Sequence, residues 1–144
     1  MAAGRANPFL MPTPLGSIGW VDLTVPDAER VRGFYEQVVG WKSQPVEMEG
    51  YSDYCMMPPG SEQPAAGVCH ARGPNADLPP TWLVYITVAN VAQSVLACQA
   101  NGGTVLREPR EMGGATIAII RDPAGAVCAL FQPAPSEPAP APAS

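Results

Sequence analysis

Charge and histidine are scarce in this chain. Of its 144 residues, eight are Lys or Arg and thirteen are Asp or Glu, the net charge is −5, and His70 is the one histidine. The basic residues are scattered, so no positive stripe exists to neutralise a nucleic-acid backbone. Hydrophobic residues make up 47% of the chain, which is typical of a folded globular protein. We therefore expect no nucleic-acid partner.

Long hydrophobic runs and paired cysteine motifs are also missing. No apolar run approaches the ~18 residues that a membrane-spanning helix needs, and the sequence MAAGRANPFLMPTPLG lacks the apolar stretch of a signal peptide. The cysteines form no CxxC motif and lie in apolar segments, which favours buried reduced thiols and leaves a disulfide as the alternative. We expect a cytoplasmic protein without a membrane partner. The four cysteines are Cys55, Cys69, Cys98 and Cys128.

The chain contains an internal repeat. VDLTVPD at Val21–Asp27 returns as VYITVAN at Val84–Asn90, sixty-three residues later. A helical pattern follows each copy and ends at a glycine, Gly40 in the first and Gly103 in the second. Two copies of one supersecondary unit in so short a chain predict a single domain built by duplication, whose working site lies where the copies meet.

The first copy predicts a strand, a helix and three strands. Ile18–Val25 alternates and is rich in β-branched residues, which is typical of a strand. Asp27 is a good helix N-cap, and Gly40 suits a left-handed C-terminal cap. A helical face recurs at i, i+3, i+4 and i+7 and should pack in the core, as should Trp41. This face comprises Val31, Phe34, Tyr35 and Val38. The three strands that follow are Trp41–Met48, Tyr51–Met57 and Ala66–Ala71.

The second copy repeats this order. Trp82–Val88 predicts a strand, and Asn90 caps a helix that buries Val91, Val95 and Cys98. Asp122-Pro123-Ala124-Gly125 predicts a tight turn. The remaining strands are Gly103–Arg107, Ala115–Ile120 and Val127–Gln132. The order βαβββ, occurring twice, predicts an α+β fold.

The predicted domain organisation has three parts. Residues 1–16 form an N-terminal arm, and residues 134–144 form an extended, disordered Pro/Ala tail. Residues 17–133 form the domain. Its modules are residues 17–72 and 81–133, joined by a linker at residues 73–80.

Three segments together carry a resemblance to a known superfamily. They are VDLTVPDAERVRGFYEQVVGW, TWLVYITVANV and RDPAGAVCALFQ. With these residues, about Ser17–Pro133 resembles the vicinal oxygen chelate superfamily, which contains glyoxalase I, bleomycin-resistance proteins and extradiol dioxygenases. The resemblance implies tandem βαβββ modules whose eight strands form a curved mixed sheet around a cleft. It also implies a homodimer.

The same resemblance implies four metal-ligand positions, which enzymes of the superfamily typically fill with two His and two Glu. Here these positions fall on Trp20, His70, Leu83 (or Trp82 if the register slips by one) and Ala129. Indole, isobutyl and methyl groups cannot coordinate a divalent ion, and one imidazole cannot hold it alone. We therefore expect no cofactor. The alternative is one divalent metal on ligands placed elsewhere, drawn from Glu47, Glu49, Asp53 and Glu62.

Strand alternation predicts which side chains line the cleft. In the first strand Val21, Leu23 and Val25 should pack on the helix, so the intervening side chains face the cleft. Cys69 and Cys128 are expected on the helix side. The predicted cleft-facing set is Trp20, Asp22, Thr24, Tyr54 and Met56 (or else Cys55 and Met57), Val68, His70, Leu83, Tyr85, Thr87, Val127, Ala129 and Phe131.

Aromatic and apolar walls with few polar groups are typical of a small-molecule pocket. The sequence therefore predicts a metal-independent binding protein for a hydrophobic or aromatic compound. One alternative is an enzyme, a lyase or isomerase of the glyoxalase-like group. It would use a divalent metal or an acid–base couple of Asp22 and His70. Another is a structural role, with the rings of Trp20 and Tyr85 filling the cleft.

Overall fold

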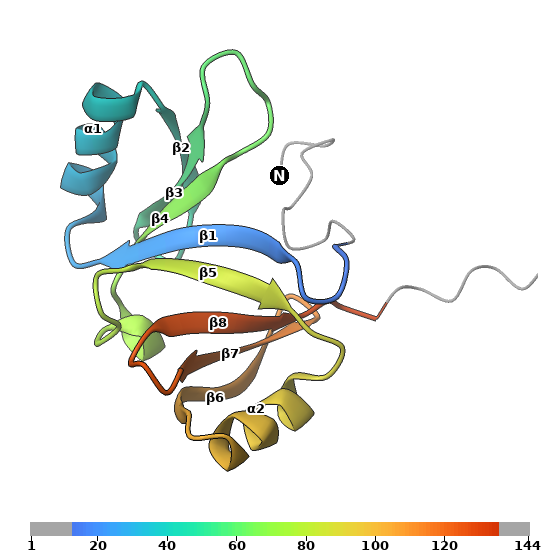
Figure 1. Cartoon of the computed structure of the whole chain (residues 1–144). Helices are drawn as coiled ribbons and strands as arrows, with labels where there is room; N and C mark the ends of the chain where they lie inside the picture. Colours follow the sequence, from blue (N-terminus) through green and yellow to red (C-terminus); the bar gives the residue numbers. More distant parts are fainter. Residues whose placement is uncertain (1–12, 136–144) are drawn as a thin grey trace, which may run out of the picture. The chain divides into compact units, whose positions relative to one another are not determined.

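The computed structural model of the chain describes residues 13–135. Its elements follow the order βαβββ twice (Figure 1). The first set comprises β1 (Ile18–Val25), α1 (Ala28–Val39), β2 (Lys42–Glu47), β3 (Ser52–Met57) and β4 (Ala66–His70). A 3₁₀ turn, η2 (Gly73–Asn75), lies in the connection. The second set comprises β5 (Trp82–Thr87), α2 (Val91–Ala100), β6 (Thr104–Met112), β7 (Ala115–Arg121) and β8 (Val127–Gln132).

The strands form an eight-stranded sheet in the order β2-β3-β4-β1-β5-β8-β7-β6. Within it β1 pairs with β4 and β5 with β8 in parallel, whereas β2–β3, β3–β4, β6–β7 and β7–β8 are antiparallel. The predicted α+β fold with a mixed sheet is therefore confirmed. The residues group into two compact units: one is Trp20–Val84, and the other joins the residues before Trp20 to those from Tyr85 onward.

Helix α1 covers one face of the sheet in the Trp20–Val84 unit. Asp27 Oδ1 accepts a hydrogen bond from Arg30 N at 3.0 Å, and Gly40 closes the helix in the left-handed conformation at φ 78°. Both caps confirm the sequence prediction. The core beneath the helix consists of Leu23, Val25, Ala28, Met56 and Val68.

The predicted buried face of α1 is half right. Val31 and Tyr35 pack against this core, as does Trp41. Phe34 and Val38 do not, since they are 56% and 59% exposed. The buried stripe starts one turn earlier, at the fully buried Ala28, and this shift rotates Phe34 and Val38 toward solvent.

Helix α2 covers one face of the second unit. Asn90 Oδ1 accepts from Gln93 N at 2.9 Å, which confirms Asn90 as the N-cap. Val91 and Val95 are buried and pack against Ala118 and Leu130. The side chain of Gln132 accepts a hydrogen bond from Val91 N at 2.9 Å, so the last strand holds the start of the helix.

Strand β6 is longer than the predicted Gly103–Arg107. It continues to Met112, which pairs with Ala115 across a two-residue turn. Gly113 and Gly114 form this turn with φ 59° and 87°, and such positive values suit the tight hairpins that glycine permits. Pro109 falls within the strand and is tolerated because β6 lies at the edge of the sheet and its register is irregular there.

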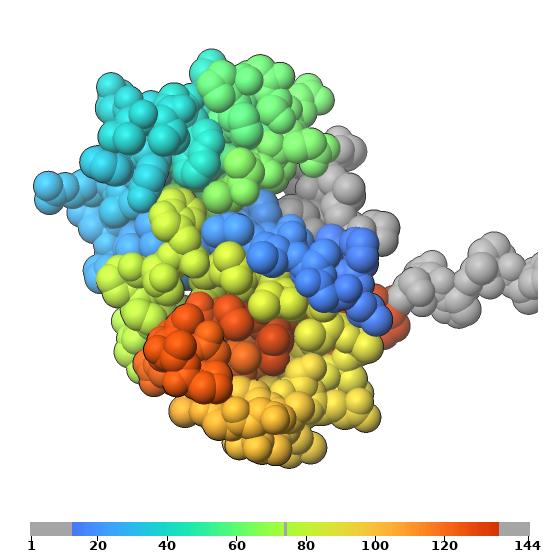
Figure 2. All heavy atoms as spheres, viewed as in Figure 1, coloured from blue at the N-terminus to red at the C-terminus, as the bar shows by residue number. Residues whose placement is uncertain are grey.

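The predicted turn at Asp122–Gly125 is confirmed. Asp122 Oδ1 accepts from Ala124 N and Ala126 N at 2.8 and 3.0 Å, and Gly125 N donates to Asp122 O at 2.9 Å. The turn lies against the end of α2 (Figure 2), where a Cβ at Gly102 would lie 3.7 Å from Pro123 Cγ. The turn thereby helps to fix α2 on its strands.

Residues 13–17 dock on the end of β5. Gly16 N donates to Thr87 O at 2.8 Å, Thr87 N donates to Ser17 O at 2.9 Å, and the hydroxyls of Thr13 and Thr87 are 2.6 Å apart. Most of the predicted arm (residues 1–12) and of the Pro/Ala tail (residues 136–144) lies outside the described residues. Within the described part, no helix is long and apolar enough to span a membrane.

Candidate functional site

The face of the sheet opposite α1, here the α1-distal face, carries Trp20, Asp22 and Thr24. The register pairs Asp22 with Gly67 and Thr24 with Cys69, and Gly67 with Cys55, so these side chains point the same way. Trp20, Asp22 and Thr24 are 9%, 7% and 6% exposed. The face therefore combines one large ring with a buried carboxyl, a hydroxyl and two thiols.

A glycine on this face makes room for the indole. A Cβ at Gly67 would lie 3.1 Å from Asp22 Cβ and 3.3 Å from Trp20 Cζ2. Both contacts are tighter than side chains normally accept. Gly67 is therefore the position on β4 over which the Trp20 ring lies, and sequence reasoning did not single it out.

The register corrects several predicted cleft positions. His70 pairs with Val25 and Val68 with Leu23, so both lie on the α1 side of the sheet. Tyr54 pairs with Val68, and Met56 with Ala66, which puts Tyr54 and Met56 on the α1 side too. The alternative residues, Cys55 and Met57, lie on the α1-distal face. Met56 is fully buried in the α1 core and is a packing residue.

The same correction separates Asp22 from His70. Their register partners, Gly67 for Asp22 and Val25 for His70, lie on opposite faces of the sheet. The predicted Asp22–His70 acid–base couple is therefore wrong in its geometry. The alternation predicted for β4 differs by one residue from the observed register. The same difference placed Cys69 on the α1 side in the prediction, whereas it lies on the α1-distal face.

Carboxylates surround Cys69 on the α1-distal face. Burial raises the pKa of the Cys69 thiol, and the negative charges of Asp22 and Asp53 raise it further. A thiol with a raised pKa stays protonated at neutral pH and is a poor nucleophile and metal ligand. Cys69 thus serves as packing and as a neighbour of two carboxyls. All four cysteines are free, as predicted.

Asp53 is the carboxylate that contacts His70. Its Oδ1 accepts from His70 N at 2.8 Å and lies 3.5 Å from His70 Nδ1. The His70 side chain is 14% exposed, and the Asp53 side chain is 15% exposed. A carboxylate beside Nδ1 can orient an imidazole. The structure therefore offers an Asp53–His70 pair, formed where the start of β3 adjoins the end of β4.

Two tyrosines and two arginines flank His70. Its ring centroid lies 5.6 Å from that of Tyr51, edge to face, and 6.4 Å from that of Tyr54. The guanidinium of Arg72 lies 4.2 Å from the Tyr51 centroid, and that of Arg32 lies 5.0 Å from the Tyr54 centroid. The imidazole therefore contacts two tyrosine rings, each of which also contacts a guanidinium group.

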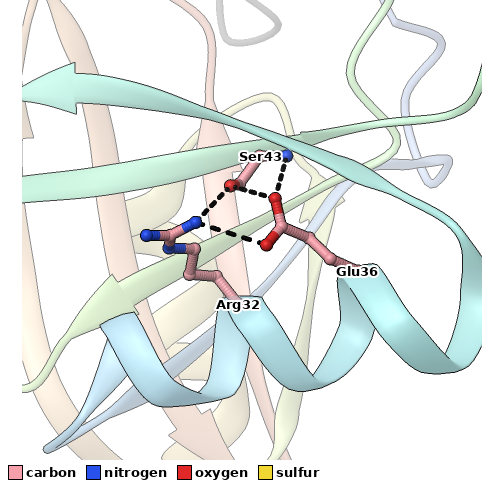
Figure 3. A network of polar contacts seen from close by, with 3 residues as sticks. All are labelled: Arg32, Glu36 and Ser43. Carbon is pink, nitrogen blue, oxygen red and sulfur yellow. Dashed lines mark hydrogen bonds and ion pairs between the residues drawn. The ribbon is translucent and has the colours of Figure 1, made fainter.

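Arg32 is fixed in turn by Glu36 and Ser43 (Figure 3). Its Nη1 donates to Glu36 Oε1 and Ser43 Oγ, both at 3.2 Å, and Ser43 Oγ donates to Glu36 Oε2 at 2.7 Å. The hydrogen bonds from Ser43 lower the pKa of Glu36, and the charge of Arg32 adds to the effect. The network ties α1 to β2 and keeps Arg32 beside Tyr54.

The face of the sheet opposite α2, here the α2-distal face, carries the side chains that strand alternation predicted to lie together. Tyr85 pairs with Ala129 and Thr87 with Phe131, so these four side chains share one face. Ile117 and Ile119 extend the face through β7, because they pair with Phe131 and Ala129. Cys128 pairs with Ile120, which packs against the α2 core, so Cys128 lies on the helix side as predicted.

Register identifies the β4 position that matches Ala129. Asp22 and Tyr85 are counterparts in the repeat; Asp22 pairs with Gly67, and Tyr85 pairs with Ala129. The fourth ligand position implied by the resemblance is therefore Gly67, and His70 is not in it. The four positions are Trp20, Gly67, Leu83 and Ala129. Leu83 is 4% exposed and points away from its neighbour Trp82, which packs on the α1 core.

These four residues do not fit a divalent metal. They offer no side-chain nitrogen, oxygen or sulfur that can coordinate, since the indole nitrogen of tryptophan is a donor only. Among residues 13–135, no three His, Cys, Asp or Glu side chains are grouped so that they could hold an ion. Asp53, the member of the alternative ligand set that lies near His70, is engaged by the His70 amide.

The chain belongs to the Glyoxalase/Bleomycin resistance protein/Dioxygenase superfamily, whose family model matches residues 17–130. The putative glyoxylase CFP32 of Mycobacterium tuberculosis is 28% identical over 123 residues, covering 85% of this chain and 46% of that protein. The anthracycline biosynthesis protein DnrV of Streptomyces peucetius is 27% identical over 129 residues, covering 81% and 47% respectively. The chain thus spans about half the length of these curated relatives.

Solved structures share the fold. Methylmalonyl-CoA epimerase from Mycobacterium tuberculosis superposes with a TM-score of 0.54 at 16% identity, covering 90% of this chain and 97% of that one. A methylmalonyl-CoA epimerase in complex with methylmalonyl-CoA and NH4+ gives 0.53 at 17% identity, covering 88% and 100%. At these identities the likeness concerns the fold.

Proposed function

We propose that this protein binds a small hydrophobic or aromatic molecule against the helix-distal faces of its sheet, without a metal ion at the four ligand positions of the superfamily. Trp20 supplies an aromatic wall in the Trp20–Val84 unit. Tyr85, Ala129 and Phe131 supply a ring-and-aliphatic surface in the other. Asp22 and Thr24 are the polar groups of the first surface, and Thr87 is the polar group of the second.

One observation carries the proposal: Trp20 lies over Gly67 where the superfamily's metal enzymes place two ligands. The close approach at Gly67 shows that the indole occupies the space a ligating side chain on β4 would need. The family match supports retention of the fold, and the side chains of Trp20, Gly67, Leu83 and Ala129 support a surface without coordinating atoms. Binding of an apolar compound uses such a surface, whereas Lewis-acid chemistry does not.

Tryptophan fluorescence and thermal shift test the proposal directly. A panel of aromatic and aliphatic compounds is titrated against wild-type protein and against Trp20→Leu, with Trp41→Leu as the control that removes an indole from the α1 core. A binder should quench wild-type fluorescence and raise its Tm, and Trp20→Leu should weaken that binding. If no compound class changes either signal, the proposal is wrong.

The Asp53–His70 contact favours a second candidate, a lyase or isomerase step in which His70 transfers a proton. The carboxylate 3.5 Å from Nδ1 leaves Nε2 as the atom that would exchange a proton with a substrate. His70→Gln should abolish such an activity, and Asp53→Asn should reduce it and displace its pH profile. Activity that survives His70→Gln unchanged would eliminate this candidate.

Two further predictions accompany the proposal. A homodimer would shield Phe34 and Val38, which stand four residues apart on α1 and are both more than half exposed. Light scattering should then give twice the monomer mass, and Phe34→Ser should return it to the monomer value. The cytoplasmic location is tested by fractionation of the producing cells.

A further inference from the structure

Two arginines lie over tyrosine rings, and they differ in charge balance. Arg32 lies over the Tyr54 ring and is paired with Glu36, whose Oε1 is 3.2 Å from Arg32 Nη1 (Figure 3). Arg72 lies over the Tyr51 ring, and its guanidinium carbon is 4.2 Å from the ring centroid. Within residues 13–135, the side chain of Arg72 makes no hydrogen bond and no ion pair. The positive charge of Arg72 is therefore without a carboxylate partner there.

Tyr51 also contacts His70, so one ring touches both side chains. The centroids of the Tyr51 and His70 rings are 5.6 Å apart, and their planes are nearly perpendicular, at 81°. Beyond His70 the pairing of β4 with β1 continues, since Ala71 N donates to Val25 O at 2.8 Å. Arg72 is itself extended, at φ −135° and ψ 155°. Residues i and i+2 of an extended chain project to the same side, with Cα atoms about 7 Å apart, so His70 and Arg72 lie side by side.

The two nitrogens of the His70 ring have different surroundings. Nδ1 is buried, makes no hydrogen bond and lies 3.5 Å from Asp53 Oδ1. Nε2 is not buried, and within the described part of the chain no hydrogen bond engages it. Asp53 is engaged by the His70 amide at 2.8 Å and lies on the Nδ1 side of the ring. Nε2 is therefore the ring nitrogen that a ligand in solvent can reach.

Arg72 and His70 together suit an anion that has several oxygen atoms. A guanidinium donates two parallel hydrogen bonds to a carboxylate or phosphate, and imidazole Nε2 donates one more when it carries a proton. Arg72 is exposed, so an anion reaches it without entering a cavity. The contact with Tyr51 already restrains the guanidinium, which reduces the side-chain entropy lost on binding.

We propose that Arg72 and His70 form a binding site for an oxyanion, the phosphate or carboxylate group of a small molecule. Arg72 binds the oxyanion as a charged fork, His70 Nε2 donates a further hydrogen bond, and Tyr51 positions both side chains. This site lies on the Trp20–Val84 unit and goes beyond the proposed function. It requires neither an apolar ligand on the helix-distal faces nor a reaction at His70.

The single histidine makes this site directly observable by NMR. The imidazole Cε1–H signal of untagged, isotope-labelled protein belongs to His70, because the chain has no other histidine. Inorganic phosphate and sodium acetate are titrated separately at constant ionic strength and about pH 6, in the acidic part of the range where imidazole titrates. Wild type should show a saturable shift of this signal, and the tighter of the two anions identifies the group that the site prefers.

Four variants and one control assign the binding to these side chains. Arg72→Gln should weaken it about tenfold, the loss expected for one charge-assisted hydrogen bond, and Arg72→Lys should recover part of the affinity. The control Arg30→Gln removes the same charge from an exposed position on α1 and should bind like wild type. Tyr51→Phe keeps the ring and should also bind like wild type, whereas Tyr51→Leu removes the ring and should weaken binding.

Two results would overturn the inference, with matched Tm values showing that the variants fold. If neither anion gives a saturable shift in wild type, the site does not exist. If Arg72→Gln binds as tightly as wild type, the assignment of Arg72 is wrong. Neither result bears on the binding of an apolar compound, which the fluorescence of Trp20 measures separately.

Discussion

The indole of Trp20 lies over the α-carbon of Gly67, so closely that a Cβ there would be 3.3 Å from Cζ2. The two residues come from β1 and β4, the parallel pair at the centre of the Trp20–Val84 unit. The ring occupies the place where the resemblance implies metal ligands. An aromatic group in that place offers an apolar surface and no side-chain atom that can coordinate an ion.

Gly67→Ala should therefore destabilise the protein and move Trp20. The added methyl group meets Asp22 Cβ at 3.1 Å as well as the indole, and overpacking of this kind costs about 1–3 kcal/mol. Urea unfolding measures the loss, and the Trp emission maximum reports the displaced ring. Gly33→Ala is the matched control: it lies in α1 with open space around it and should stabilise by about 0.5–1 kcal/mol. Equal effects at both glycines would contradict the packing described.

Met56→Ala should lower stability strongly without altering the ligand surface. The side chain is fully buried in the α1 core, and truncation of such a residue costs about 2–5 kcal/mol. Met48→Ala, at a position 40% exposed, should stay within about 0.5 kcal/mol of wild type. Ligand affinity, measured on the folded fraction at low temperature, should be unchanged in both variants. A specific loss of affinity in Met56→Ala would show that Met56 contributes to the ligand surface.

Cys69 should make the protein lose stability at alkaline pH. Burial raises its pKa in the folded state, with Asp22 and Asp53 adding to the shift, whereas the unfolded thiol ionises near its ordinary value of 9.0. Its contribution is therefore fully present below pH 9.0 and is lost as the pH rises above that value. The unfolding free energy of Cys69→Ala should fall less steeply than that of wild type across this range. Parallel curves would show that the thiol does not titrate as described.

Glu36 should make the protein lose stability at acidic pH, as the pH falls. Hydrogen bonds from Ser43, with the charge of Arg32, lower its pKa below the ordinary 4.5. The carboxylate's contribution is therefore present above pH 4.5 and disappears as the pH falls through the lowered value. Because Glu36 is near solvent, the effect should be about 0.2–1 kcal/mol. Glu36→Gln and Ser43→Ala should both reduce the acid-dependent part of the unfolding free energy; a variant that kept it would locate the titrating group elsewhere.

Local signals in the sequence predicted the elements well. β1 and β8 begin and end at the predicted residues, and the caps Asp27, Gly40 and Asn90 were identified from residue type. These features depend on alternation and on side-chain hydrogen bonds to nearby amides, which one segment of sequence contains in full.

Register and bulges could not be predicted, because they depend on which strands pair and how. β4 is five residues long, and the similar letters VCH and VCA suggested one alignment of the repeat. In the structure Val68 pairs with Leu23, which gives a different alignment of the repeat. The two alignments differ by one residue, and this difference moves His70 to the opposite face of the sheet. The shifts in β6 leave no distinct residue signal either, so the sequence did not predict the face on which Arg107 and Arg110 lie.

Metal content tests the central claim most directly. Protein purified without chelator, from medium supplemented with zinc, nickel, manganese and iron, is analysed by elemental mass spectrometry after buffer exchange. Because Trp20, Gly67, Leu83 and Ala129 offer no ligating atoms, we predict divalent metal far below one ion per chain. Treatment with EDTA should leave the binding of an aromatic ligand unchanged. One stoichiometric ion per chain, whose removal abolishes that binding, would contradict the account.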